Sequence, residues 1–444
     1  MNWWRSLSWT RLPRKLSEAV ASEGSKTGLF PPTTNKQHKL WLILIIPLSV
    51  LLIFQICRLI YQNPTLLPQS STTTTRKVFQ QNAQTLQTPK TEGRSLIHRL
   101  RWRVRNTFQR SFPPPTATQV SEGLLLHNME QITCAGLGNF LFAVASVIGV
   151  ARSTYRQPGL FQGMGTARQG LFPHLNFYAV PKAQSLTDDK LKNVIIDTGV
   201  AGIHNLDIYK QIMQSRKNDD GLVDFVIISG YMQSWRYLEA FHDEVRQRLQ
   251  FAPSIYESAI QALVLNTPKY ILKNSSRPDG QPYTLVGIHV RRGDMVNHGY
   301  GYQPASEAYL LACVSYFTRY YPNVLFVVAS NDISYCPKLF QGSFVFIATV
   351  NPPEVDMALL TLMDHLILSV GTFGWWSAYL KDAIEIWFYK TWYKSGSGVE
   401  NEYVSRDYFL PTWNVSDYKQ LMLLRRWTTV GCLLTLFVCY TIVQ

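Results

Sequence analysis

The chain has 444 residues, of which 46% are hydrophobic, and a formal net charge of +14. It can therefore bury a large core and hold more than one domain. The positive charge lies at the N-terminal end, because the first 110 residues carry 17 of the 43 Lys and Arg but only three of the 29 Asp and Glu. The remainder is balanced in charge. This argues against nucleic acid as a partner, since nucleic-acid-binding domains carry a basic surface on their folded part.

The six cysteines are too few for a disulfide scaffold. Three of them, Cys134, Cys313 and Cys336, lie outside the apolar runs, and one disulfide among these three is possible in an oxidising compartment. No set of Cys and His residues has the spacing of a zinc site.

An uncharged apolar run of 18 residues, 40–57, follows a tail rich in Lys and Arg, 1–39. A helix needs about 20 apolar residues to cross a bilayer, so the run predicts a transmembrane helix. The positive-inside rule places the tail in the cytosol and makes the helix the signal anchor of a single-pass type II membrane protein. A buried core helix is the alternative.

Residues 58–120 are rich in Gln, Ser, Thr and Pro, a composition typical of a disordered stem. Within this stem, residues 98–105 alternate basic and apolar side chains. Such a stretch could bind lipid headgroups or an acidic partner, or it could simply be solvated.

From residue 121 onward, strand-like and helix-like patterns alternate with Gly or Pro between them, which predicts an α/β fold. The strand candidates are 223–229, 284–290, 324–329 and 366–370, and the helix candidates include 305–320, 355–366 and 375–380.

Two motifs stand in the first part of this body. Gly136 and Gly138 open an apolar helix, either as a ligand loop or as a tight turn that packs the helix on a sheet. Further on, residues 230–237 place aromatic side chains beside Gln233 and Ser234. Exposed aromatic rings would stack on a sugar while the polar groups bind its hydroxyls, and aromatic core packing is the alternative.

The strand candidate 284–290 ends in Arg291, Arg292, Gly293 and Asp294. Sheets of α/β proteins bind ligands at the carboxyl ends of their strands. Two guanidinium groups beside a tight turn suit a phosphate, so the pattern predicts an anion clamp. Taken alone, the stretch fits a surface arginine pair at a strand end equally well.

The strand candidate 366–370 leads through Gly371, Thr372, Phe373 and Gly374 into a helix. A helix N-terminus offers free backbone N–H groups, and glycines let a ligand approach the backbone closely. Together with the arginines, this turn predicts a diphosphate held from two sides, as in a nucleotide sugar. No GxxxxGK[ST] loop is present, which argues against a P-loop NTPase.

The last apolar run, 427–443, is a second membrane segment, a packed terminal helix or an atypical tail. Asn274 and Asn414 begin Asn-x-Ser sequons, and we predict that both are glycosylated on the lumenal side.

From about Cys134 to Trp413 the chain resembles the galactoside α-1,2-fucosyltransferases of glycosyltransferase family 11. The residues from His289 to Asp294 match the His-x-Arg-Arg-x-Asp motif that this family shares with other fucosyltransferases. The narrower resemblance rests on motifs in the same order: Leu137-Gly138-Asn139, Gly230-Tyr231-x-Gln233-Ser234, Ser330-Asn331-Asp332, Asp356-x-Ala358-Leu359-Leu360, Gly371-Thr372-Phe373-Gly374 and Leu410-Pro411-x-Trp413.

The resemblance implies a GT-B-like fold with two Rossmann-type halves and the donor site between them. Residues 121–280 would form the acceptor-side half, 281–420 the GDP-fucose-binding half, and 421–444 an apolar C-terminal segment. It also implies a location in the Golgi membrane with the catalytic domain in the lumen.

The activity implied is transfer of L-fucose from GDP-β-L-fucose to the 2-OH of a terminal galactose on glycoproteins or glycolipids. The transfer would proceed with inversion to an α-1,2 linkage and without a metal cofactor. The alternatives are another GDP-sugar glycosyltransferase and a membrane-anchored glycan-binding protein without turnover.

The resemblance also suggests roles for individual residues. Arg291 would hold the β-phosphate with support from Arg292 and His289, and Asp356 would bind the guanine edge. The residues Thr372, Phe373 and Gly374 would line the diphosphate. Asp294 is the candidate general base, or else a carboxylate that orients Arg291.

Overall fold

The computed structural model describes residues 96–109, 123–128, 136–161, 168, 170–175, 177–180, 193–215, 225–273, 282–321, 323–342, 344–347, 351–381, 385–417 and 419. All of them belong to one compact unit, Pro89–Gln444. The predicted tail 1–39, the membrane helix 40–57 and the terminal run 427–443 lie outside the described residues, as do Cys134 and Asn274. Within the described part of the chain, every helix is too short or too polar to cross a bilayer.

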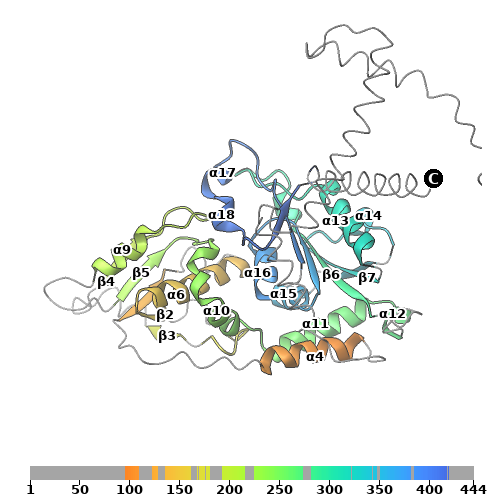
Figure 1. Cartoon of the computed structure of the whole chain (residues 1–444), viewed down its shortest axis with the longest axis horizontal. Coiled ribbons are helices and arrows are strands. Elements are labelled where there is room, and N and C mark those ends of the chain that lie inside the picture. The colour runs from red at the N-terminus through yellow and green to blue at the C-terminus, as the bar shows by residue number, and fades with distance from the viewer. Residues whose placement is uncertain are drawn as a thin grey trace, which may run out of the picture. The chain divides into compact units, whose positions relative to one another are not determined.

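Five parallel strands form the first sheet, in the order β3-β2-β1-β5-β4. Their bounds are β1 Leu124–His127, β2 Gln157–Phe161, β3 Tyr178–Val180, β4 Asn193–Asp197 and β5 Phe225–Ser229. The strand order reverses between β1 and β5. Helix α6, Leu137–Ser153, stands between β1 and β2 in the chain (Figure 1). Nearly all of its residues are buried, which agrees with its apolar composition.

Six parallel strands form the second sheet, in the order β11-β10-β9-β6-β7-β8. Their bounds are β6 Thr284–Val290, β7 Val324–Ser330, β8 Phe344–Ile347, β9 His365–Leu368, β10 Glu385–Tyr389 and β11 Asn414–Ser416. Strands β6 to β8 extend to one side and β9 to β11 to the other, so the order reverses between β6 and β9. Doubly wound sheets bind ligands at such a reversal, beyond the carboxyl ends of the strands.

Helices and short 3-10 turns connect the strands. Ser306 caps α13 by accepting a hydrogen bond from the Tyr309 N–H, and prolines occupy the first turns of α11 and α15. The remaining elements are α9 Asp207–Gln214, η2 Trp235–Tyr237, η3 Glu239–Phe241, α10 His242–Arg248, α11 Pro253–Asn266, α12 Lys269–Lys273, η4 Gly293–Met295, α13 Glu307–Tyr320, α14 Cys336–Leu339, α15 Pro353–Thr361, α16 Thr372–Lys381, α17 Gly398–Glu402 and α18 Ser405–Tyr408.

One hydrophobic core includes residues of both sheets, for example Val226 of β5 and Ile288 of β6. Helices α6 and α16 join the two sheets directly, because the rings of Phe142 and Trp375 pack with their centroids 4.4 Å apart. The two sheets therefore fold as parts of a single body, and the first turns of α6 and α16 are brought together.

The α/β prediction is confirmed, and the strand candidate 284–290 coincides with β6. The helix candidate 355–366 is too long, since α15 ends at Thr361 and β9 begins at His365. The chain turns between them because the Asp364 carboxylate accepts a hydrogen bond from the Leu285 N–H at 2.8 Å, which ties the turn to the start of β6.

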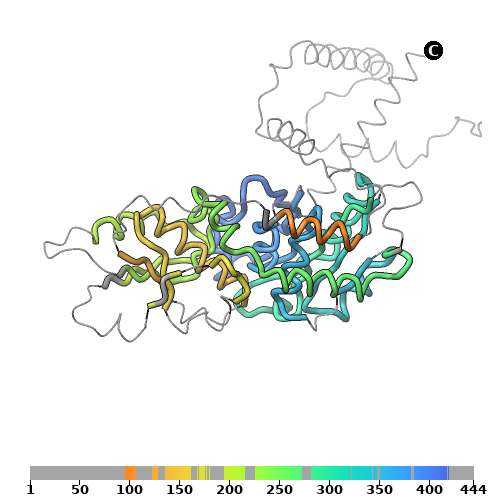
Figure 2. Tube along the Cα trace, turned by 90° about the horizontal axis from the view of Figure 1, so that it is seen from below, coloured from red at the N-terminus to blue at the C-terminus, as the bar shows by residue number. Residues whose placement is uncertain are grey.

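The prediction of a disordered stem is wrong for residues 96–109, which form helix α4, Leu96–Gln109. This helix lies along α11 (Figure 1, Figure 2). Its Leu100 is fully buried, Arg103 forms an ion pair with Asp364, and Arg99 donates to the Tyr283 carbonyl at 2.7 Å. The sequence left an acidic partner open for the basic residues 98–105, and the structure supplies one within the chain, Asp364.

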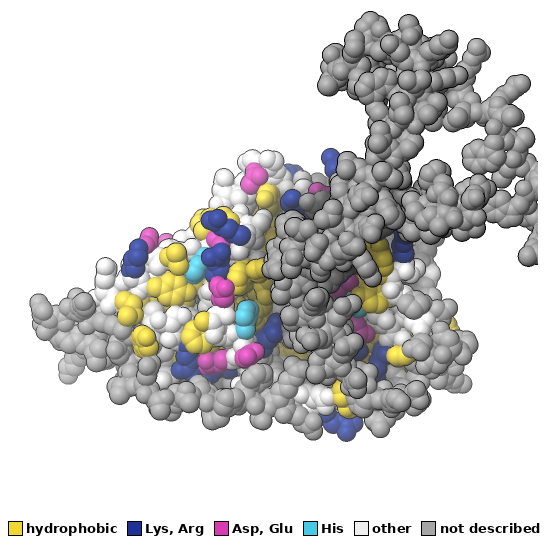
Figure 3. Space-filling view, in the orientation of Figure 1, with side chains coloured by type: hydrophobic (Ala, Val, Ile, Leu, Met, Phe, Trp, Pro, Cys, Tyr) yellow, Lys and Arg dark blue, Asp and Glu magenta, His cyan; other side chains and the backbone are white. Residues whose placement is uncertain are grey.

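Charged side chains of both signs are mixed on the face of the molecule drawn in Figure 3. Arg236 and Asp407 form an ion pair at 2.9 Å, and so do Arg152 and Glu244. This surface agrees with the balanced charge of the body and differs from the basic surface that binds nucleic acid.

Candidate active site

Arg291 is the first residue after β6 and lies at the strand reversal of the second sheet. Its backbone N–H donates to Ser369 Oγ at 2.8 Å, directly beyond the neighbouring strand β9. Its guanidinium group donates to Asp294 through Nε at 3.2 Å and through Nη2 at 2.5 Å. This two-point contact uses one edge of the guanidinium group and directs Nη1 elsewhere.

The glycine turn before α16 lies against Nη1 of Arg291. A Cβ atom built on Gly371 would lie 3.2 Å from Nη1, and Gly371 has a φ of +97° that disfavours any other residue. Helix α16 begins at the next residue, Thr372. The first N–H groups of a helix have no acceptor within the helix, so guanidinium and backbone donors are adjacent here.

A second helix N-terminus meets the first one at this point. A Cβ atom on Gly138 of α6 would lie 2.6 Å from the carbonyl carbon of Thr372, so the two helices touch at their first turns. Asn139 Oδ1 accepts hydrogen bonds from Thr372 Oγ1 at 2.8 Å and from Gln233 Nε2 at 3.1 Å. Two positive helix ends thus converge beside Arg291, which favours an anionic ligand.

His289 forms a neutral wall of this site. Its ring is buried, stacks on Phe373 with the centroids 5.3 Å apart, and leaves no room for a Cβ on Gly374, which would lie 2.6 Å from Nδ1. Burial, together with the nearby charge of Arg291, lowers the pKa of His289 to about 3. His289 is therefore uncharged at neutral pH and cannot serve as a second cation for a phosphate.

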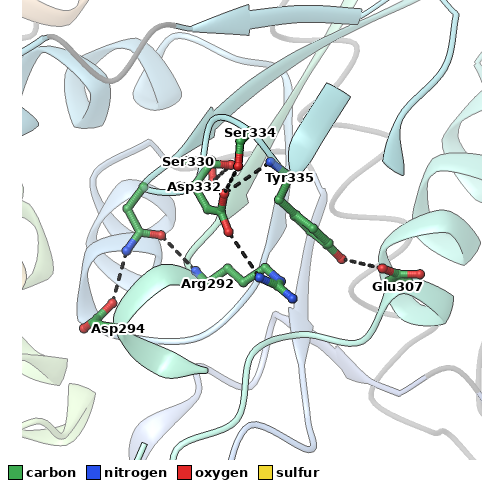
Figure 4. Close-up of polar contacts among 8 residues, drawn as sticks. Arg292, Asp294, Glu307, Ser330, Asp332, Ser334 and Tyr335 are labelled. Carbon is green, nitrogen blue, oxygen red and sulfur yellow. Dashed lines mark hydrogen bonds and ion pairs between the residues drawn. The ribbon is translucent and has the colours of Figure 1, made fainter. Parts of the chain in front are cut away.

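The side chain of Arg292 lies beside Asp332 and Tyr335 (Figure 4). Its Nη1 donates to Asp332 Oδ2 at 3.2 Å, and its guanidinium carbon lies 4.3 Å from the ring centroid of Tyr335. Its backbone N–H donates to Asn331 Oδ1 at 2.8 Å. The structure thus separates the two arginines that the sequence suggested as a joint clamp.

Asp294 is held as the anionic partner of Arg291. Hydrogen bonds from Arg291 lower the pKa of Asp294, while partial burial opposes that shift. A carboxylate with a low pKa is a weak base, so the geometry favours the orienting role over the general-base role.

Asp356 lies on α15 and accepts a hydrogen bond from Asn351 Nδ2 at 3.1 Å. Burial raises the pKa of Asp356 to about 6, and this hydrogen bond opposes the rise. Among the described residues it shares no hydrogen bond with the Arg291 group, so its role at the guanine edge stays a prediction.

The motif after β5 is mostly buried. Tyr231 is 37% exposed, whereas Trp235 and Tyr237 are buried. Gln233 is buried as well and accepts a hydrogen bond from Tyr403. The expected exposed aromatic surface therefore reduces to Tyr231, and the other rings pack in the core.

Residues 224–417 match the family model described as glycosyl transferase family 11. This part of the chain is similar to glycosyl transferase family 11. Galactoside alpha-(1,2)-fucosyltransferase 2 of Bos taurus is 33% identical over 165 residues, which are 35% of this chain and 45% of that protein. Galactoside 2-alpha-L-fucosyltransferase SEC1 of Bos taurus is 29% identical over 202 residues, which are 43% of this chain and 51% of that protein. The chain thus matches about half the length of these relatives.

Two fucosyltransferase structures are more distant likenesses. POFUT1 in complex with GDP-fucose has a TM-score of 0.40 and 11% identity, covering 61% of this chain and 98% of that chain. Fucosyltransferase NodZ from Bradyrhizobium has a TM-score of 0.36 and 12% identity, covering 58% of this chain and 93% of that chain.

Three residues to which the sequence analysis gave no role organise this site, namely Ser369, Asn331 and Asn139. Two of them could have been found from the sequence by their positions at strand ends. Ser369 and Asn331 directly follow β9 and β7, the two neighbours of β6. Because parallel strands end at one edge of a sheet, polar residues at these positions lie beside Arg291 and Arg292. Asn139 has no such signal.

The described residues contain no cluster of three His, Cys, Asp or Glu side chains that could hold a metal ion, and the expectation of a metal-free reaction stays a prediction. Cys313 and Cys336 are buried free thiols, so neither forms the disulfide that the sequence left open. The sequon residue Asn414 is exposed at the start of the edge strand β11.

Proposed function

We propose that the chain transfers L-fucose from GDP-β-L-fucose to the 2-OH of a terminal galactose on glycoproteins or glycolipids. The family match and the names of the two Bos taurus relatives support this substrate pair. The observation that carries the proposal is the position of Arg291. Its Nη1 lies against Gly371 at the start of α16, where guanidinium and backbone donors can share a diphosphate.

The proposed reaction is a single displacement. Galactose O2 attacks C1 of fucose, its hydroxyl proton passes to water, the bond from C1 to the β-phosphate oxygen breaks, and GDP leaves with the electron pair. The β-linked donor therefore gives an α-1,2 product. Arg291 and the N-termini of α6 and α16 stabilise the charge that grows on the leaving phosphate, which is usually the largest contribution to catalysis. This arrangement of donors supports a reaction without a metal ion.

Two further residues extend the donor site in this proposal. Asp356 accepts hydrogen bonds from the guanine edge, for which a carboxylate is the matching group. Phe373 and the neutral His289 line the diphosphate. We assign Asp294 the role of orienting Arg291, because its carboxylate is already engaged by that guanidinium group.

We also propose a GT-B-type arrangement with the donor between the two sheets. The contact between the first turns of α6 and α16 supports this placement. The apolar run 40–57 and the basic tail before it support a single-pass type II protein of the Golgi membrane with the body in the lumen. The exposed side chain of Asn414 suits lumenal glycosylation.

The test is a donor panel on the full chain with a β-galactoside acceptor, in which GDP-fucose is compared with other GDP-sugars and with UDP-sugars. We expect transfer from GDP-fucose, and an α-1,2 linkage in the product. Transfer from another GDP-sugar would establish the nearest rival activity. Glycan binding without release of GDP would establish a binding protein instead.

The same assay tests Arg291 by substitution. We expect Arg291→Ala to lower kcat by roughly a hundredfold or more, as loss of a charge-stabilising donor does elsewhere, with an unchanged unfolding temperature. The matched control is Arg319→Ala, which removes an exposed arginine from α13 and should keep full activity. A folded Arg291→Ala variant with full activity contradicts the assignment.

A further inference from the structure

Asn331 connects the backbone of Arg292 to Asp294, the carboxylate that binds Arg291. It is the first residue after β7, and its side-chain amide forms hydrogen bonds through both its oxygen and its nitrogen. Oδ1 accepts from the Arg292 N–H at 2.8 Å, and Nδ2 donates to Asp294 Oδ1 at 3.1 Å. A Cβ on Gly293 would lie 3.2 Å from Asn331 Nδ2, so this glycine leaves the space that the amide occupies.

The carboxylate of Asp294 needs such a support. Its side chain is 50% exposed, so water competes for both of its oxygens. Oδ1 receives Arg291 Nε and Asn331 Nδ2, while Oδ2 receives Arg291 Nη2. A neutral donor on Oδ1 fixes the rotation of the carboxylate at which both oxygens face Arg291. That rotation in turn decides which edge of the Arg291 guanidinium group is left for a ligand.

We infer that Asn331 is a positioning residue, whose side-chain amide fixes Asp294 so that Arg291 presents Nη1 toward Gly371. It acts through Asp294 and makes no contact with the reacting atoms. The catalytic consequence of this inference rests on the proposed function, whereas the positioning itself can be measured without any substrate.

Asn331→Asp removes the hydrogen bond that the amide donates to Asp294 and keeps the one that it accepts from Arg292. The new carboxylate has nearly the same shape and still accepts from the Arg292 N–H. At the position of Nδ2, however, it places a second negative oxygen against Asp294. The Asp294 carboxylate is then repelled, and Arg291 loses its fixed orientation.

The substrate-free measurement is the rate at which phenylglyoxal modifies Arg291 in the full chain, followed by peptide mass spectrometry. We expect Asn331→Asp to raise this rate severalfold, because the guanidinium group is released from its ion pair. In the Asp294→Asn background the same substitution should change the rate little, since the carboxylate on which Asn331 acts is gone. An unchanged rate, or the same increase in both backgrounds, overturns the inference.

The control variant Asn266→Asp repeats the change from amide to carboxylate on α11, where the amide donates to the Ala262 carbonyl at 2.8 Å. It should leave the Arg291 modification rate unchanged, and an increase equal to that of Asn331→Asp would overturn the inference as a general charge effect. A thermal unfolding curve for each variant identifies any rate increase that comes from unfolding, which also counts against positioning.

Fucose transfer provides the second readout. Asn331→Asp should lower kcat/KM for GDP-fucose roughly tenfold, as the loss of a charge-assisted hydrogen bond does, with KM for the acceptor unchanged. An equal loss through the acceptor KM would overturn the inference. A wild-type chain that transfers no fucose contradicts the proposed function, and the modification rates then still decide the role of Asn331.

Discussion

Gly138→Ala should damage the site more than it damages the fold. Gly138 is the second residue of α6, and its Cα faces the first turn of α16. An alanine Cβ would lie 2.6 Å from the carbonyl carbon of Thr372 and 2.8 Å from the backbone nitrogen of Phe373. Neither backbone atom can rotate away, so the two helix N-termini must separate.

The required separation is about 0.8 Å, because ordinary contacts of a Cβ begin at 3.4 Å. Overpacking of this kind costs about 1–3 kcal/mol of stability. Alanine is favoured over glycine within a helix by about 1 kcal/mol, which offsets part of that cost. The catalytic rate has no such compensation, since a shift of about 1 Å in the groups that hold the substrate can lower it by about a hundredfold.

The assay is kcat/KM for fucose transfer beside the thermal unfolding temperature of the same sample. Gly136→Ala is the matched control, because a Cβ on Gly136 meets no atom within 4 Å although it lies at the N-cap of the same helix. We expect Gly136→Ala to stay active and Gly138→Ala to lose about a hundredfold. A fully active Gly138→Ala variant would show that the junction of α6 and α16 does not shape the donor site.

Two other predictions concern Asp356 and helix α4. Because burial raises the pKa of Asp356 to about 6, its carboxylate gains a proton between pH 7 and pH 5. GDP-fucose affinity measured by calorimetry should then fall about tenfold, and Asp356→Asn should abolish this pH dependence; a flat wild-type profile would refute the guanine contact. A chain that begins at residue 110 lacks α4, with its buried Leu100 and the ion pair of Arg103 with Asp364, and should be less stable than one that begins at residue 89 by about 3 kcal/mol or more. Equal unfolding temperatures for the two chains would show that α4 adds nothing to the fold.

The sequence located β6 well because a β-branched apolar run there is bounded by turns and arginines. It placed the end of α15 too late, because the apolar pattern continues from this helix into β9. From Leu359 to Leu368 nearly every side chain is buried, so the pattern has neither the helical nor the strand period. Helix α4 was missed because part of what holds it, the carboxylate of Asp364, lies far away in sequence.

The site was predictable where neighbouring strands decide it. Arg291 and Gly371 follow β6 and β9, and parallel strands that pair must end side by side. The sequence did not show that Arg292 is held by Asp332 and the ring of Tyr335, because both follow β7 and lie far from it in the chain. Its support of a diphosphate stays a prediction. The contact of Asn139 with Thr372 depends on how two separate sheets pack, and no local pattern encodes that.

The contact between the first turns of α6 and α16 gives the first sheet a part in the site around Arg291. The family match begins at residue 224 and so excludes α6, yet Gly138 and Asn139 touch Thr372 in the turn beside Arg291. The matched segment alone would lack one of the two helix N-termini that favour an anion. The two sheets also share one core, so α6 cannot shift without moving α16. In the proposed function, the first sheet is therefore a wall of the donor site as well as an acceptor platform, and changes made in α6 to alter acceptor choice should alter donor affinity too.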